Sequence, residues 1–116
     1  PGAKAQVFVK GEKEPLKFCS VKDGFVYVLQ PENAKRTVAF WVSDFGNKKD
    51  IPLHEKMLLA QKAFFNAGSD VRGAMGKSIL PFATKEEVQA FTKEHGGTIV
   101  NYSEVNLGLL KSLKGH

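Results

Sequence analysis

Met75 is the residue in this chain whose type and setting point most specifically to a chemical role. It lies in the run Gly73-Ala74-Met75-Gly76. A buried methionine usually fills a gap in a core. This run has neither helical nor strand periodicity, which indicates a partly exposed side chain. A thioether is a soft ligand that suits Cu(I) better than zinc or magnesium. Met75 is therefore a candidate copper ligand, with packing as the alternative role.

Two further residues could assist Met75. The sequence predicts a short helix over residues 54–61, and His54 and Met57 would share one face of it because they are three residues apart. Imidazole and thioether groups both bind copper. This spacing is common by chance, so the pair ranks below Met75.

Cys19 is the only cysteine, which excludes an intramolecular disulfide and a four-thiolate zinc site. It follows a predicted strand and precedes a predicted helix cap. A helix N-terminus can lower the pKa of a thiol. However, the position suits a small packed side chain, so we expect Cys19 to be buried and structural.

No constellation typical of catalysis is present. Glu86 and Glu87 are adjacent, so they do not share a helix face. The run that ends in Gly76-Lys77-Ser78 fails the phosphate-loop pattern, because Val71 stands where the first glycine is required. The sequence predicts a protein that is not an enzyme.

The composition favours one small domain with a solvated basic surface. The chain has 116 residues and a formal charge of +5. Its lysines and arginines are scattered in runs of two at most, and no nucleic-acid-binding signature is present, so we expect no nucleic-acid partner. No stretch has the apolar length of a membrane span. The opening at Pro1, without a signal peptide, predicts a processed or trimmed chain.

The elements that would position these residues form two similar series followed by a tail. Ser20 and Thr84 each precede a predicted helix and have an acid three residues on, as in a capping box. The second helix ends at His95-Gly96-Gly97, where glycine favours a left-handed turn. The predicted units are a first half (1–46) with strands at 6–9, 16–19 and 37–42, a second half (47–105) with strands at 62–66, 79–82 and 98–102, and a C-terminal tail (106–116) with a frayed helix.

An internal repeat supports this division. An offset of 64 residues places Leu16 on Leu80, Ser20 on Thr84 and Asp23 on Glu87. The strand, the cap and the acid therefore coincide in both halves. The sequence predicts an α+β fold in which two homologous ββαβ halves pack as one small domain and leave a cleft between them.

Over nearly its whole length except the tail, the chain resembles the NosL family, the copper-binding accessory proteins of nitrous oxide reductase assembly. The Gly-x-Met-Gly run with the His-Gly-Gly close is the more specific part. The residues that carry the resemblance are Ala60-Gln61-Lys62-Ala63-Phe64-Phe65, Gly68-Ser69-Asp70-Val71-Arg72-Gly73-Ala74-Met75-Gly76, Pro81-Phe82, Phe91 and His95-Gly96-Gly97, with Ala5-Gln6-Val7-Phe8-Val9, Phe18-Cys19-Ser20-Val21-Lys22-Asp23 and Val42-Ser43-Asp44 in the first half.

The resemblance implies a two-half ββαβ fold, similar in part to the organomercurial lyase fold. It implies a periplasmic or cell-envelope protein, lipid-anchored in its precursor, that delivers Cu(I) to a client copper protein, nitrous oxide reductase. Met75 matches the methionine of the family's Met-Gly motif. The family's Cys-Gly-Met segment, which lies just before the part where this chain starts, does not occur here, and Cys19 occupies a position that is often serine. The resemblance therefore implies an incomplete Cu(I) site in this chain.

Two functions remain open from the sequence. The first is a copper-binding accessory protein that uses Met75, with help from His54 or Met57. The second is a structural or protein-interaction module of the same fold that has no metal function. A precursor with a lipoprotein signal followed by Cys-Gly-Met would favour the first.

Overall fold

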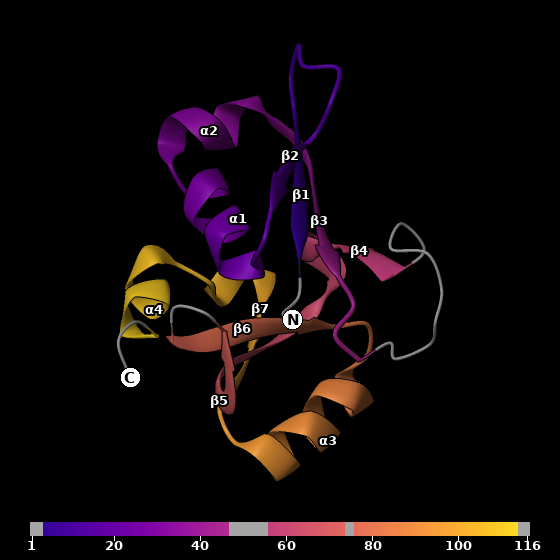
Figure 1. Ribbon diagram of the computed structural model, residues 1–116, viewed down its shortest axis with the longest axis vertical. Helices are drawn as coiled ribbons and strands as arrows, with labels where there is room; N and C mark the ends of the chain where they lie inside the picture. The colour runs from indigo at the N-terminus through magenta and orange to yellow at the C-terminus, as the bar shows by residue number, and fades with distance from the viewer. Residues whose placement is uncertain (1–3, 47–55, 74–75, 114–116) are drawn as a thin grey trace.

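The computed structural model describes residues 4–46, 56–73 and 76–113, which form two antiparallel sheets with helices packed beside them (Figure 1). The first sheet has the strand order β2-β1-β3-β4 and the second has the order β6-β5-β7. The first group of elements is β1 (Ala5–Val9), β2 (Leu16–Phe18), α1 (Val21–Val28), α2 (Pro31–Arg36), β3 (Thr37–Ser43) and β4 (Met57–Leu59). The second is β5 (Phe64–Gly73), β6 (Gly76–Phe82), α3 (Lys85–His95), β7 (Thr98–Asn101) and α4 (Leu107–Ser112), with 3₁₀ turns at Ala60–Lys62 and Tyr102–Glu104.

The predicted repeat is confirmed by strand pairing. In each half the first strand lies between its hairpin partner and the strand that follows the helices. Ala5 pairs with Phe18 and Val42, and Phe64 pairs with Phe82 and Asn101. The offset of 64 residues thus holds for Phe18 and Phe82, whereas the first and last strands are offset by 59, from 5 to 64 and from 42 to 101. The difference arises because the second hairpin is longer, while α2 lengthens the first half.

Both predicted helix caps are present. The Ser20 hydroxyl accepts a hydrogen bond from the Asp23 N–H at 3.1 Å, and the Thr84 hydroxyl accepts one from the Glu87 N–H at 3.1 Å. Gly24, which lowers the helix propensity of α1, lets this helix approach its sheet closely. A Cβ at Gly24 would lie 2.9 Å from the Cβ of Ala5 and 3.0 Å from the ring of Phe40. Tertiary packing therefore outweighs propensity at this position.

The two halves share one hydrophobic core. Phe25 of α1 makes edge-to-face contacts with Phe40 of β3 and Phe65 of β5, at ring-centroid distances of 5.0 and 5.3 Å. Such pairs add stabilisation beyond the area they bury. The Phe45 N–H also donates to the carbonyl of Pro81 in the other half at 2.8 Å. Aromatic rings thus fill the space between α1 and β5, in the region where a cleft was expected.

Two local predictions were wrong. Residues 57–59 are a strand, not part of a helix, because they pair with β3 at the edge of the first sheet, with Trp41 opposite Leu59 and Ser43 opposite Met57. The glycine-rich stretch is mostly strand as well, since β5 continues to Gly73 and β6 begins at Gly76. Cross-strand pairing decided both segments, and a single sequence does not show it.

Pro31 separates α1 from α2. It prevents α1 from continuing, and it occupies the first position of α2, where its fixed φ suits a helix start. The predicted C-terminal helix is present as α4, which buries Leu110. None of the helices in the described ranges is long and apolar enough to cross a membrane.

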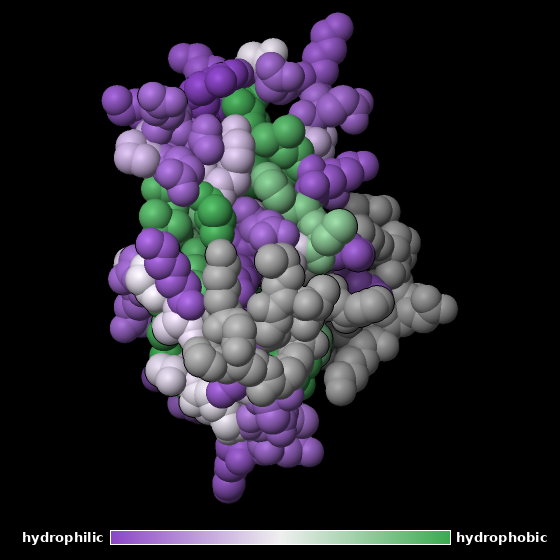
Figure 2. Space-filling model, turned by 60° about the vertical axis from the view of Figure 1, so that its left-hand side comes forward, coloured by the Kyte–Doolittle hydropathy of each residue, from purple (hydrophilic) through white to green (hydrophobic). Residues whose placement is uncertain are grey.

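The surface is polar at both ends of the molecule. On the face shown in Figure 2, hydrophilic side chains crowd the upper and lower ends, and apolar surface is confined to the middle. Among the described bulky apolar side chains, Val38 has the largest exposed fraction, at 69%. This distribution fits the solvated surface predicted from the charge.

Candidate metal-binding site

The two glycines that flank the Ala74-Met75 pair in the sequence lie at paired strand ends. Gly73 and Gly76 are opposite one another as the last pair of the β5–β6 ladder, and Ala74 and Met75 join them. Met75 itself and His54 lie outside the described residues. Their candidacy therefore continues to rest on their residue types and their positions in the sequence.

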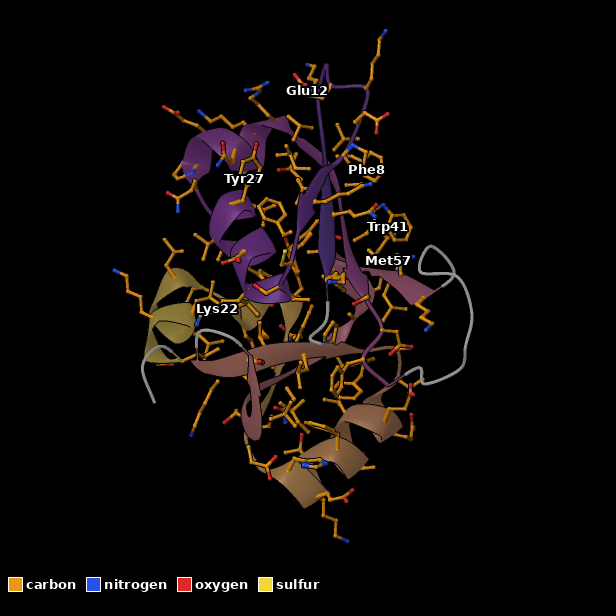
Figure 3. The ribbon with its side chains drawn as sticks, in the orientation of Figure 1. Phe8, Glu12, Lys22, Tyr27, Trp41 and Met57 are labelled. Atoms are coloured by element: carbon orange, nitrogen blue, oxygen red, sulfur yellow. The ribbon has the colours of Figure 1, made fainter. Side chains whose placement is uncertain are left out.

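Met57 lies on β4, at the edge of the first sheet. Figure 3 shows its side chain on the same side of the sheet as Phe8 and Trp41, whereas Tyr27 of α1 lies on the other side. In Figure 1, β4 is at the right of the molecule and the start of β6 is at the left. Met57 is therefore distant from the strand ends that flank Met75, and it does not share a helix face with His54.

The surroundings of Met57 are apolar. Strand pairing places Trp41 opposite Leu59 and Gln6, and Phe8 opposite Ala39, all on the outer face of the first sheet. We call Phe8, Trp41, Met57 and Leu59 the outer-face cluster. Each of the four is half-buried and lies outside the main core. A methionine among such side chains serves packing as readily as metal binding.

Cys19 is exposed, so the prediction that it is buried was wrong. The reason is the alternation of side chains at the end of β2. Phe18 points inward and packs against Tyr27, with ring centroids 5.7 Å apart. The next residue, Cys19, accordingly points away from the core.

A large bulge in β5 carries an exposed carboxylate. Ala67 pairs with Ile79 and Arg72 with Lys77, so four residues of β5, from Gly68 to Val71, lie opposite Ser78 alone. Gly68 has a φ of +81°, which suits glycine. Bulges of this kind re-aim side chains and occur often beside functional sites. Here the bulge carries Asp70, whose side chain is 66% exposed.

The Asp70 carboxylate binds the imidazole of His95 at the end of α3. The distance between Asp70 Oδ1 and His95 Nδ1 is 2.9 Å. The imidazole also lies against the ring of Phe91, with centroids 4.5 Å apart and planes inclined by 30°. Two contacts thus restrain a ring whose side chain is 32% exposed.

Asn66 and Gly97 lock the bulge to the end of α3. The fully buried Asn66 side chain donates to the Thr92 hydroxyl at 2.8 Å and to the Gly96 carbonyl at 2.9 Å. Gly97 has a φ of +93°, and a Cβ there would lie 2.8 Å from the Ala67 carbonyl and 2.9 Å from the Ser69 nitrogen. Only glycine fits, so the distance between β5 and α3 is fixed here.

The sequence did not reveal this arrangement. His95 was expected only at a helix ending and within the runs that resemble the NosL family, and Asp70 had no assigned role. The two residues are 25 apart in the chain, and pairing between them depends on the bulge. In the described ranges, no three of His, Cys, Asp and Glu gather closely enough to hold a metal ion.

Comparison with known proteins gives the family. The NosL family model matches residues 1–110. The chain belongs to the NosL family. It is 34% identical over 109 residues to the copper-binding lipoprotein NosL of Achromobacter cycloclastes, a match that covers 90% of this chain and 56% of that protein. It is 33% identical over 112 residues to the copper-binding lipoprotein NosL of Stutzerimonas stutzeri, which covers 96% and 58%.

Solved structures of NosL proteins share the fold. The crystal structure of the copper chaperone NosL from Shewanella denitrificans matches with a TM-score of 0.84 and 29% identity, covering 93% of this chain and 81% of that chain. The solution structure of apo-NosL from Achromobacter cycloclastes matches with a TM-score of 0.65 and 32% identity, covering 92% and 88%. The chain spans little more than half the length of the curated NosL relatives it matches.

Proposed function

We propose that this NosL-family chain is a copper-binding accessory protein without catalytic activity, which holds Cu(I) and passes it to a client copper protein. Membership of the family supports the metal, because NosL relatives are named copper-binding lipoproteins and a copper chaperone. The observation that carries the proposal is Met75, a soft donor between paired strand ends at Gly73 and Gly76. The family's nitrous oxide reductase is the proposed client, and the cell envelope, through a lipid anchor in the precursor, is the proposed location.

We further propose how the candidate ligands divide. Met75 supplies a thioether at the end of the β5–β6 ladder. Met57, with His54 shortly before it in the chain, would form a second contact for copper, because β4 lies on the opposite side of the molecule from the start of β6 (Figure 1). One thioether holds Cu(I) weakly, so this chain should bind less tightly than a form extended at its N-terminus by a Cys-Gly-Met segment.

The division of the chain is also a proposal. We assign residues 1–46 and 47–105 to the two halves and residues 106–116 to a tail. The described strands add one detail, since β4 belongs to the second range in sequence but to the first sheet in space. A strand contributed across the boundary would tie the halves together.

A transfer experiment tests the function. The chain and its extended form are loaded with Cu(I) under anaerobic conditions and mixed with the copper-free client, and the copper content of each protein is measured after separation. We expect Cu(I) uptake by both forms, tighter in the extended form, and copper in the client at the end. If neither the chain nor its extended form takes up Cu(I), the proposal is overturned. The interaction module, which would bind a partner without copper, would then be favoured.

A further inference from the structure

His95 and Asp70 form a preset nitrogen donor outside the sulfur sites. A carboxylate can only accept, so Nδ1 of the imidazole carries the proton that is donated to Asp70 Oδ1 at 2.9 Å. In the neutral ring this tautomer leaves a lone pair on Nε2. In the described part of the chain, Nε2 has no hydrogen-bond partner. The ring thus offers one free donor atom.

The donor is held in place before any metal arrives. Phe91 covers one face of the imidazole at 4.5 Å, and Asp70 fixes its rotation. The supports are themselves fixed, since Gly97 packs against the backbone of the bulge and Asn66 binds Gly96. A ligand on such rigid supports loses little conformational entropy on binding.

This geometry is typical of metal-ligating histidines. Such residues commonly donate the second ring N–H to a carboxylate, which fixes the tautomer and raises the basicity of the ligating nitrogen. Imidazole is a good ligand for copper. We propose that His95 is a copper ligand through Nε2 and that Asp70 is its positioning residue. The proposal rests on the proposed copper function and adds a nitrogen donor to it.

A structural role is the competing explanation. His95 lies in the last turn of α3, where a protonated imidazole would interact favourably with the helix dipole and with Asp70. Loss of His95 would then change stability and leave copper affinity unchanged. The two explanations differ in what the metal does to the ring.

Competition against a Cu(I) chelator distinguishes a copper-binding His95 from a structural one. We expect His95→Gln to weaken Cu(I) binding by the extended form at least tenfold, and Asp70→Asn to weaken it about tenfold, as is usual when the partner of a ligating histidine is lost. His116→Gln, which removes another of the three histidines, is the control and should bind as the wild type does. Thermal unfolding of each variant shows whether it is folded.

Nitrogen NMR of the imidazole supplies a second readout. On addition of Cu(I) to the wild type, the Nε2 resonance of His95 should shift while Nδ1 stays protonated. If the wild type binds Cu(I) but this resonance does not move and His95→Gln binds equally well, His95 is structural and only this inference fails. If the wild type takes up no Cu(I), the proposed function fails together with it.

Discussion

At the scale of single residues, placement depends on neighbours that the sequence does not display. The caps Ser20 and Thr84 could be predicted, because a cap acts on residues two or three positions away. Cys19 could not, because its exposure follows from the direction in which Phe18 points. The pair of His95 and Asp70 was missed for the same reason, since a bulge in β5 creates it.

The reactivity of Cys19 tests whether its thiol is exposed, as the structure shows, rather than buried. In the native protein it should react with a soluble thiol reagent within about tenfold of its rate in denaturant, because its side chain is exposed. The measurement is the rate of absorbance change on mixing with and without denaturant, with Cys19→Ser as the blank. A native rate more than about a hundredfold slower would show that the thiol is buried after all.

Gly97 tests the close approach between α3 and the bulge. Gly97→Ala should lower the free energy of unfolding by about 2 kcal/mol or more, because the left-handed backbone is strained and the Cβ meets the backbone of Ala67 and Ser69. Gly96→Ala is the matched control. Its φ is also positive, at +76°, but a Cβ there meets nothing within 4 Å, so about 1 kcal/mol is expected. Equal losses in denaturant titrations would contradict the packing described.

At the scale of elements, three helices were predictable, whereas α2 and the strand edges were not. Local caps and periodicity located α1, α3 and α4. Short runs such as Met57–Leu59 become strands only when a neighbouring strand pairs with them. The glycine-rich run shows the same dependence, since β6 pairs with Arg72 and Gly73 beyond the bulge. The soft donors were found by residue type, but the place of Met57 at the edge of the first sheet became known only from strand pairing.

The two caps test the equivalence of the halves. Ser20→Ala and Thr84→Ala should each lower the free energy of unfolding by about 1 kcal/mol, because each leaves one helix N–H without its side-chain acceptor. Gln89→Ala, at an exposed position in the middle of α3, should change it by less than about 0.5 kcal/mol and serves as control. A negligible effect at either cap would show that the two helix starts are not equivalent.

At the scale of the whole molecule, two repeats share one hydrophobic core, so we expect them to unfold as one cooperative unit. The repeated ββαβ order was predictable from the offset of 64 residues, but the way the halves join was not. Phe25 contacts strands of both sheets, so its packing depends on Phe40 and Phe65 being brought together in space. This joint core gives a stable support on which exposed donors can sit.

Phe25 tests this cooperativity. Phe25→Ala should lower the free energy of unfolding by about 3–5 kcal/mol, because it leaves a cavity where the two halves meet. In the wild type, unfolding followed by Trp41 fluorescence and by far-UV circular dichroism should coincide. Val38→Ala, at an exposed site, should change stability little. Separate transitions for the two probes in the wild type would mean that the halves unfold independently.

The proposed function depends most on Met75, whose sulfur we propose binds Cu(I). Met75→Leu removes the thioether and keeps an apolar side chain of similar volume, and Met75→Ala removes both. In anaerobic competition against a Cu(I) chelator, both variants of the extended form should bind at least tenfold more weakly than the wild type, and His116→Gln should bind equally well. Unchanged affinity in both Met75 variants would contradict the assignment of Met75 as a copper ligand.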